Sequence, residues 1–391
     1  MKKNSILDYL KNNLESFEEM PFNNVDSLIL CQFFYGKMEN QINDFIDKKC
    51  MIKDLYRAEY FDKMFYDDIS DEENKETLIL MAANPRFRNI KIKNLVSEYS
   101  EKREMQFAAV TYELDENTDY VCFRGTDGTM MGWKEDFNMA FMPETPSQAN
   151  AVRYLKIFCD NNEGKNFYVG GHSKGGNLAV YGASLCGNKI QQKIIKIFSH
   201  DGPGFRDEFF LEEGFVNIKD RICKMVPQTS AVGMLLENQE EYRIVKSSAI
   251  SIIHQHSAFT WIVKDNDFEY LKERSSGGVY IDNTMHQWLM SATLEEREIF
   301  VDTLFKIFTD NGIDSIKDAN SIGVKDIALI IGSLDELDEE TKKVFFSMIK
   351  SLIVIAVRGR TESIQKRVEL DKNSLDKVLK DINSGIFNKK K

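Results

Sequence analysis

The spacing of apolar positions divides the chain into three regions. In residues 1–100, apolar residues recur every three or four positions, as in VDSLILCQFFYGKMENQINDFI, which is typical of amphipathic helices. In residues 101–290, short apolar runs alternate with helical patterns, and residues 291–391 return to helical periodicity. We therefore expect an N-terminal helical region packed on a central core, the core itself, and a C-terminal helical region.

The central region carries the signals of a mostly parallel sheet. The β-rich runs MQFAAVTYEL and YVCFRG flank DENTD and predict a hairpin. After the helical stretch PSQANAVRYLKIFCDN come a strand (KNFYVGG), a helix (GNLAVYGASLCG) and two further strands (KIIKIFSH and DRICKMV). Strands that alternate with helices indicate a parallel sheet covered on both faces, so we expect the α/β class.

One segment carries a specific chemical signal. Gly171-His172-Ser173-Lys174-Gly175 fits the pattern G-x-S-x-G, with a strand running into it and a small-residue helix leaving it. This is the context of a nucleophile elbow, a sharp turn that raises a serine above the sheet. The alternative is a glycine-rich structural turn with an incidental serine. The flanking pattern favours Ser173 as a nucleophile.

A serine hydroxyl needs a general base, and the base needs an orienting acid. In enzymes with such an elbow the order along the chain is serine, acid, histidine. His256 follows the last predicted strand and is the preferred base, with His254 as the alternative. Asp201 directly follows the strand KIIKIF, at the edge where α/β sites are built, and is the preferred acid. The alternative for Asp201 is a turn residue that caps its own backbone.

Acyl transfer also needs donors for the developing oxyanion. We expect the backbone N–H of Lys174, which follows the nucleophile, and that of Thr126 in the loop VCFRGTDG. Arg124 is expected to anchor this loop through an ion pair. Apolar residues after the loop and before the histidine are candidates for a substrate pocket, with ordinary core packing as the alternative: Met130, Met131, Trp133, Phe137, Met234 and Leu235.

Composition narrows the class of protein. The formal charge of -11 argues against broad binding to nucleic acid or anionic lipid, since both need a positive field. Six scattered cysteines without a CxxC pair favour a reduced, cytoplasmic protein, and the N-terminus lacks the features of a signal peptide. The longest apolar run near the end, SLIVIAV, is far shorter than the ~20 residues that span a bilayer.

These motifs resemble the class 3 lipase branch of the α/β-hydrolases. FRGTDG is similar to that family's oxyanion loop, GWKEDF to the Trp and Asp that follow it, and GGHSKGG to its GHSLGG elbow. More closely, the chain resembles a bacterial Mbeg-like family through ILDYL, PFNNVDSLIL, DGPGF, VPQTSAVGMLL and QHSAFTW, from residue 5 to about 265. The resemblance implies an α/β-hydrolase fold with Ser173, His256, Thr126 and Lys174 in the roles given above.

The chain departs from the class 3 pattern at the acid. In that family the Asp follows the strand that corresponds to DRICKMVP, where this chain has Ser230. Either Asp201 has taken over the role from the previous strand, or the triad is incomplete. The expected function is hydrolysis of a small acyl ester or lipid-like substrate by an acyl-enzyme route that requires no metal or organic cofactor. A thioesterase, a peptidase and a non-catalytic binding or regulatory protein remain alternatives.

Overall fold

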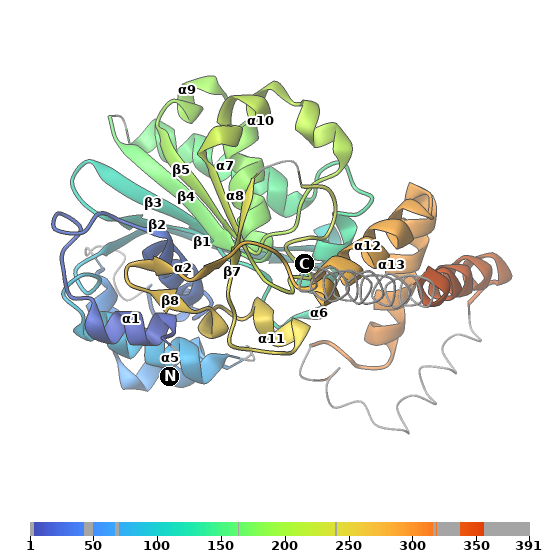
Figure 1. Ribbon diagram of the computed structural model, residues 1–391, viewed down its shortest axis with the longest axis horizontal. Helices are drawn as coiled ribbons and strands as arrows, with labels where there is room; N and C mark the ends of the chain where they lie inside the picture. Colours follow the sequence, from blue (N-terminus) through green and yellow to red (C-terminus); the bar gives the residue numbers. More distant parts are fainter. Residues whose placement is uncertain are drawn as a thin grey trace, which may run out of the picture.

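The computed structural model describes residues 4–42, 50–66, 70–162, 164–238, 241–315, 318 and 337–355. Its centre is an eight-stranded sheet with the order β1-β2-β3-β4-β5-β6-β7-β10 (Figure 1). Neighbours from β3 to β7 pair in parallel, whereas β1, β2 and β10 join antiparallel. The strands are β1 (Lys91–Ser100), β2 (Met105–Glu113), β3 (Thr118–Phe123), β4 (Asn166–His172), β5 (Ile194–His200), β6 (Ile222–Pro227), β7 (Tyr242–Val245) and β10 (Tyr270–Leu271).

Both faces of the sheet are buried, because successive side chains of each strand enter different cores. On β2, Ala108 and Val110 join a cluster with the N-terminal helices, while Phe107 and Ala109 join a cluster with helices of the opposite face. The first cluster takes residues from α1 (Ile6–Asn12), α2 (Asn24–Phe33) and α5 (Asp71–Ala83), and the second from α7 (Pro146–Asn161), α8 (Lys174–Leu185) and α10 (Glu213–Ile218). Figure 1 shows these helices on either side of the strands.

A third cluster joins the C-terminal helices to α6 (Met130–Asn138). It contains residues of α12 (Ser276–Met290), of α13 (Leu294–Asp310) and of a helix over residues 339–355. An ion pair of 2.8 Å between Lys134 and Asp302 and a hydrogen bond of 2.9 Å from Met130 N–H to the Asp314 carbonyl add polar contacts. In Figure 1, α12 and α13 stand beside α6, away from the N-terminal helices.

Short elements complete the described part of the chain. A two-stranded sheet pairs β8 with β9. The remaining elements are α3 (Glu39–Ile42), α4 (Phe61–Met64), α9 (Asn188–Gln191), α11 (Ile252–His256), β8 (Val263–Lys264), β9 (Asp267–Phe268) and the 3-10 turns at Ile52–Leu55, Ala58–Tyr60, Glu101–Arg103, Asp207–Leu211, Lys219–Arg221 and Ala258–Thr260.

The expected α/β-hydrolase class is confirmed by the mostly parallel sheet with helices on both faces. Two strands escape the apolar pattern. β1 lies within the N-terminal segment expected to be helical, and its residues are mostly half-exposed because it is the edge strand. β7 has only four residues, two of them exposed. Within the described ranges, no helix is long and apolar enough to cross a membrane. The C-terminal stretch over 358–391, in which ten Lys and Arg stand against five Asp and Glu, lies outside those ranges.

Candidate active site

Ser173 occupies a strained turn between β4 and α8. Its φ of 57° and ψ of -133° are unfavourable for a residue with a side chain, and such strain is typical of functional turns. Glycine is required on both sides of the turn. A Cβ on Gly171 would lie 2.2 Å from the Gly175 backbone, and a Cβ on Gly175 would lie 2.2 Å from the Phe123 carbonyl oxygen. The strand, turn and helix therefore have the geometry of a nucleophile elbow.

His256 and Asp201 lie in direct contact. His256 Nδ1 is 2.7 Å from Asp201 Oδ2, and the Asp201 side chain is fully buried whereas that of His256 is 25% exposed. Asp201 follows β5 with a positive φ of 51°, and its N–H donates to the Met225 carbonyl. His256 ends the short helix α11. The alternative His254 is exposed and lies on the same helix.

Ser230, which stands where the class 3 pattern has its acid, contacts Asp201. Its hydroxyl donates a hydrogen bond of 2.5 Å to Asp201 Oδ1, and the Gly233 N–H donates to the same oxygen at 3.2 Å. The Asp201 carboxylate, at the end of β5, is therefore contacted by two residues of the segment after β6 and by His256 at the end of α11. The turn alternative for Asp201 does not describe this carboxylate, because its partners are Ser230, Gly233 and His256.

His172 joins Ser173 to the histidine loop. Burial lowers the pKa of His172 to about 3, with the neighbouring His256 as a second cause, so the ring is neutral. Its Nε2 lies 2.9 Å from the His256 carbonyl and its Nδ1 lies 3.0 Å from the Tyr35 hydroxyl. A neutral ring satisfies both contacts when Nε2 donates and Nδ1 accepts. The rings of His172 and His256 are 4.6 Å apart, which places His256 beside the residue that precedes the elbow serine.

The other histidines have structural surroundings. His200 is buried against the Ser27 hydroxyl at 2.9 Å, and burial holds its pKa well below the usual range. His286 is half-exposed on α12 and lies 2.8 Å from Glu237. Arg124 forms the predicted ion pair, at 3.1 Å from Glu39.

The loop after β3 is fixed by a second aspartate. The Thr126 hydroxyl donates a hydrogen bond of 2.5 Å to Asp136 Oδ2, on α6. Burial raises the pKa of Asp136 to about 6, while Lys174 and the Thr126 hydroxyl act in the opposite direction. Its Oδ1 is buried without a hydrogen-bond partner among the described residues. Lys174 is the first residue of α8, so its N–H is not used inside the helix.

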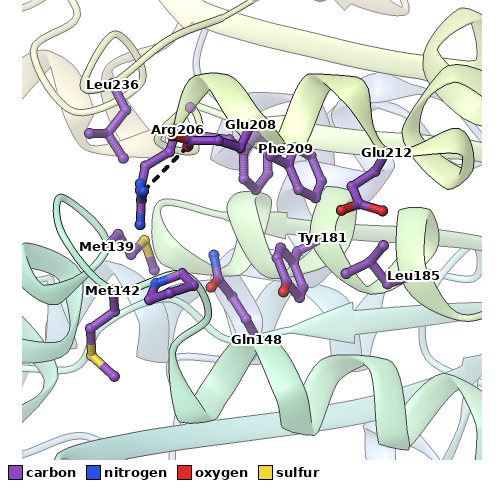
Figure 2. A pocket seen from close by; sticks show the side chains of 13 residues that line it. Met139, Met142, Gln148, Tyr181, Leu185, Arg206, Glu208, Phe209, Glu212 and Leu236 are labelled. Atoms are coloured by element: carbon purple, nitrogen blue, oxygen red, sulfur yellow. Dashed lines mark ion pairs between the residues drawn. The ribbon is translucent and has the colours of Figure 1, made fainter.

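The six residues expected to line a pocket have different surroundings. Met130 and Phe137 pack in the cluster of the C-terminal helices, Met234 is buried, and Trp133 is 37% exposed. Met131 and Leu235 are half-buried. None of the six lines the cavity of about 240 Å³ shown in Figure 2, whose walls are Met139, Met142, Pro143, Gln148, Tyr181, Leu185, Gly204, Phe205, Arg206, Glu208, Phe209, Glu212 and Leu236.

This cavity runs beside α8. Tyr181 and Leu185 lie about two and three helical turns beyond Ser173. In Figure 2, Met139 and Leu236 lie at one end of the cavity and Leu185 at the other, with the ion pair of Arg206 and Glu208 on one wall.

Sequence reasoning missed several residues around the site. The contact of Asp136 with Thr126 could have been suspected from the GWKEDF run, because Asp136 follows the oxyanion loop by only ten residues. The contacts of Tyr35 with His172 and of the Lys174 side chain with Glu135 carry no local signal, since the partners lie far apart in the sequence.

A family profile and several solved structures match parts of the chain. None of the curated proteins matches the chain. Among solved structures, the M37 lipase is 15% identical over 55% of this chain and 70% of its own, with a TM-score of 0.33. The native propeptide complex of Rhizomucor miehei lipase is 15% identical over 50% of this chain and 66% of its own, also at 0.33. The Mbeg1-like family profile matches residues 81–306, more than half of the 391 residues, and the chain therefore belongs to the Mbeg1-like family.

Proposed function

We propose that the chain is a serine hydrolase that cleaves a small acyl ester through an acyl-enzyme. The observation that carries this proposal is a strained serine at the start of α8 with an Asp–His pair beside it. A non-glycine residue at such a positive φ costs about 1–3 kcal/mol, and such strained residues cluster at functional sites. Geometry of this kind is kept where a hydroxyl must be presented to a substrate.

Ser173, His256 and Asp201 have separate roles in the reaction. Ser173 attacks the acyl carbonyl while His256 Nε2 accepts its proton, and the transfer is inferred from their common neighbour His172. Asp201 holds Nδ1–H at 2.7 Å, which fixes the tautomer that leaves Nε2 free to accept. The imidazolium then protonates the leaving alcohol. Water repeats the sequence on the acyl-enzyme and releases the acid.

The oxyanion would rest on the N–H groups of Thr126 and Lys174. Thr126 lies in the loop after β3, and its side-chain hydroxyl is hydrogen-bonded to Asp136. Lys174 is the first residue of α8, where the helix dipole also favours negative charge. Because these donors are set before the substrate arrives, they would stabilise the tetrahedral intermediate at little cost of reorganisation. The acyl group would extend into the cavity beside α8, whose lining includes Met139, Met142 and Leu185.

Covalent labelling tests this proposal directly. The protein is treated with a fluorophosphonate probe and the adduct is located by mass spectrometry. We expect labelling on Ser173 in the wild type and none in Ser173→Ala or His256→Ala. Ser184→Ala is the matched control, because Ser184 is a buried serine of the same helix that bonds the Val180 carbonyl. An intact protein that is not labelled would favour the non-catalytic alternative.

Matched oxygen esters and thioesters of one acyl chain then separate the esterase from the thioesterase. Higher kcat/KM for the oxygen ester supports the proposal as stated. Turnover of the thioester alone would keep the triad and replace the substrate class.

A further inference from the structure

The side chain after the proposed nucleophile is a fully buried ammonium. Lys174 Nζ lies 2.8 Å from the Gln106 carbonyl, 2.8 Å from Gln106 Oε1 and 3.1 Å from Glu135 Oε2. The Lys174 and Glu135 side chains are both inaccessible to solvent. These three contacts use all three N–H bonds of the ammonium group. Burial of a charge is costly unless it is paired and hydrogen-bonded, so this arrangement is tightly specified.

Glu135 extends the contact to two further segments of the fold. Its carboxylate accepts hydrogen bonds from the Gln106 N–H at 3.0 Å, the Ser147 N–H at 2.9 Å and the Ser147 hydroxyl at 2.7 Å. Gln106 belongs to β2, Ser147 to the first turn of α7 and Lys174 to α8. A single carboxylate on α6 is thereby bonded to the sheet and to both helices beside it.

The position of α6 in turn decides the position of Thr126. The next residue, Asp136, accepts the hydrogen bond from the Thr126 hydroxyl. One turn earlier, Gly132 is so close that a Cβ there would lie 2.8 Å from the Thr126 methyl group. A displacement of α6 would therefore move Thr126, whereas the N–H of Lys174 would stay with α8.

We propose that Lys174 and Glu135 are positioning residues that fix the distance between the two oxyanion donors, Thr126 and Lys174, by bonding α6 to the start of α8. This inference rests on the proposed function. An apolar side chain at position 174 would fill the same space, but it would leave α6 without a directional contact to α8. The ammonium supplies that direction because its three bonds must all be satisfied at once.

The pair also sets the field at Asp136. The groups that act on this carboxyl are Lys174 and His256, which lower its pKa, Glu135, which raises it, and the Thr126 hydroxyl, which lowers it. Loss of the Lys174 charge should therefore raise the pKa of Asp136, and loss of the Glu135 charge should lower it. Opposite shifts of the pH dependence would show that the labelling rate follows the charge of Asp136, which holds the Thr126 hydroxyl.

The experiment measures the rate of Ser173 labelling by the fluorophosphonate as a function of pH, together with the melting temperature. For Lys174→Met we expect labelling slowed about 10- to 100-fold per folded molecule, the loss expected when an oxyanion donor is displaced. The acid limb of its pH profile should shift upward. For Glu135→Gln we expect a smaller loss and a downward shift. Both variants should melt at lower temperature, because each removes one partner of a buried pair.

Two further variants separate positioning from stability. Lys174→Met/Glu135→Met removes both charges, so that neither is left buried without its partner, and it should still be labelled slowly. Arg86→Met breaks another fully buried pair, with Asp26, in the N-terminal region. It should lower the melting temperature and leave the labelling rate of the folded protein and its acid limb unchanged.

Four results would overturn the inference. The pair is merely structural if the double variant regains the melting temperature and the wild-type labelling rate. The field argument fails if the two single variants shift the acid limb in the same direction. If the wild type itself is not labelled, the proposed function has failed and this inference falls with it, whereas normal wild-type labelling with unaffected variants removes the inference alone.

Discussion

Two aspartates near Ser173 each accept a hydrogen bond from a side-chain hydroxyl, but they differ in the number of their donors. On one side the Ser230 hydroxyl donates to Asp201, and on the other the Thr126 hydroxyl donates to Asp136, both at 2.5 Å. Asp201 receives three bonds, including one from His256. Asp136 receives one, and its second oxygen is buried without a partner among the described residues.

The difference separates two uses of a buried carboxylate. A carboxylate with several donors is fixed in one orientation, which suits a group that must orient a histidine. Burial raises the pKa of Asp136 to about 6, so this carboxyl takes up its proton in mild acid. We therefore expect the Asp201 side to act through several fixed contacts, and the Asp136 side to depend on one contact that weakens in mild acid.

The largest effect is expected from Asp201→Asn. The loss of charge leaves His256 without its orienting acid and allows the wrong tautomer, so kcat for a short-chain ester should fall by about 10³- to 10⁴-fold. Asp220→Asn, an exposed position just before β6, is the control and should keep wild-type kcat. Near-normal turnover in Asp201→Asn would show that another group orients the histidine.

The deprotonated form of Asp136 should lower the free energy of unfolding. The folded chain keeps the proton up to about pH 6, whereas an unfolded Asp releases it near 3.8. Stability therefore falls as pH rises from about 4 to 6, by about 2–3 kcal/mol at most, and Asp136→Asn should remove that decline. Urea unfolding at pH 4, 5, 6 and 7 measures it. Parallel profiles for wild type and variant would contradict the raised pKa.

Asp136→Ala tests the contact itself. Without the acceptor, the Thr126 loop loses its fixed position, and kcat should fall by about 10- to 100-fold with little change in KM. Asp136→Asn keeps an oxygen acceptor for the hydroxyl and should lose less activity. Equal losses in the two variants would mean that the charge, rather than the hydrogen bond, matters for turnover.

Ser230→Ala should have a smaller effect, because Asp201 keeps the bonds from Gly233 and His256. Loss of one hydrogen bond to a charged group corresponds to about a tenfold decrease in kcat. Steady-state kinetics with the same ester measures it. A loss as large as that of Asp201→Asn would make Ser230 an indispensable part of the acid side.

The smallest effect concerns the cavity beside α8, whose lining includes Met139 at the end of α6. Leu185→Trp should fill its far end and reduce kcat/KM several-fold for long acyl chains only. Leu211→Trp is the control, since Leu211 is 84% exposed and does not line the cavity. An unchanged dependence of kcat/KM on chain length would indicate that the acyl group binds elsewhere, for example at the residues expected from the sequence, such as Met131 and Leu235.

The central strands and the elbow could be predicted because their signals are local. Both faces of β2 to β5 are buried, so these strands appear as continuous apolar runs, and the glycines around Ser173 follow from the close approach of backbones. The choice of Asp201 depended only on its place after a strand. By contrast, β1 carries no apolar run, because an edge strand need not bury both faces.

The contacts that support the site could not be predicted from local pattern. Lys174 and Glu135 are 39 residues apart, and Tyr35 and His172 are 137 residues apart. Pairing over such distances is a property of the folded chain alone. For the same reason, the sequence indicated only that Ser230 replaces the aspartate of the class 3 pattern. It did not reveal that the Ser230 hydroxyl donates a hydrogen bond to the Asp201 carboxylate.

The contacts of helix α6 determine how much of the chain is needed to hold Thr126 in place. It is bonded to the sheet by Glu135 and packed against α13 by Phe137, whose ring lies 5.6 Å from that of Phe305. The helix that binds Thr126 through Asp136 is thus held from two directions, one of which is the C-terminal helical region. The proposed activity should therefore need more of the chain than the sheet with its covering helices. A chain cut after residue 290 should keep its strands yet lose the labelling of Ser173.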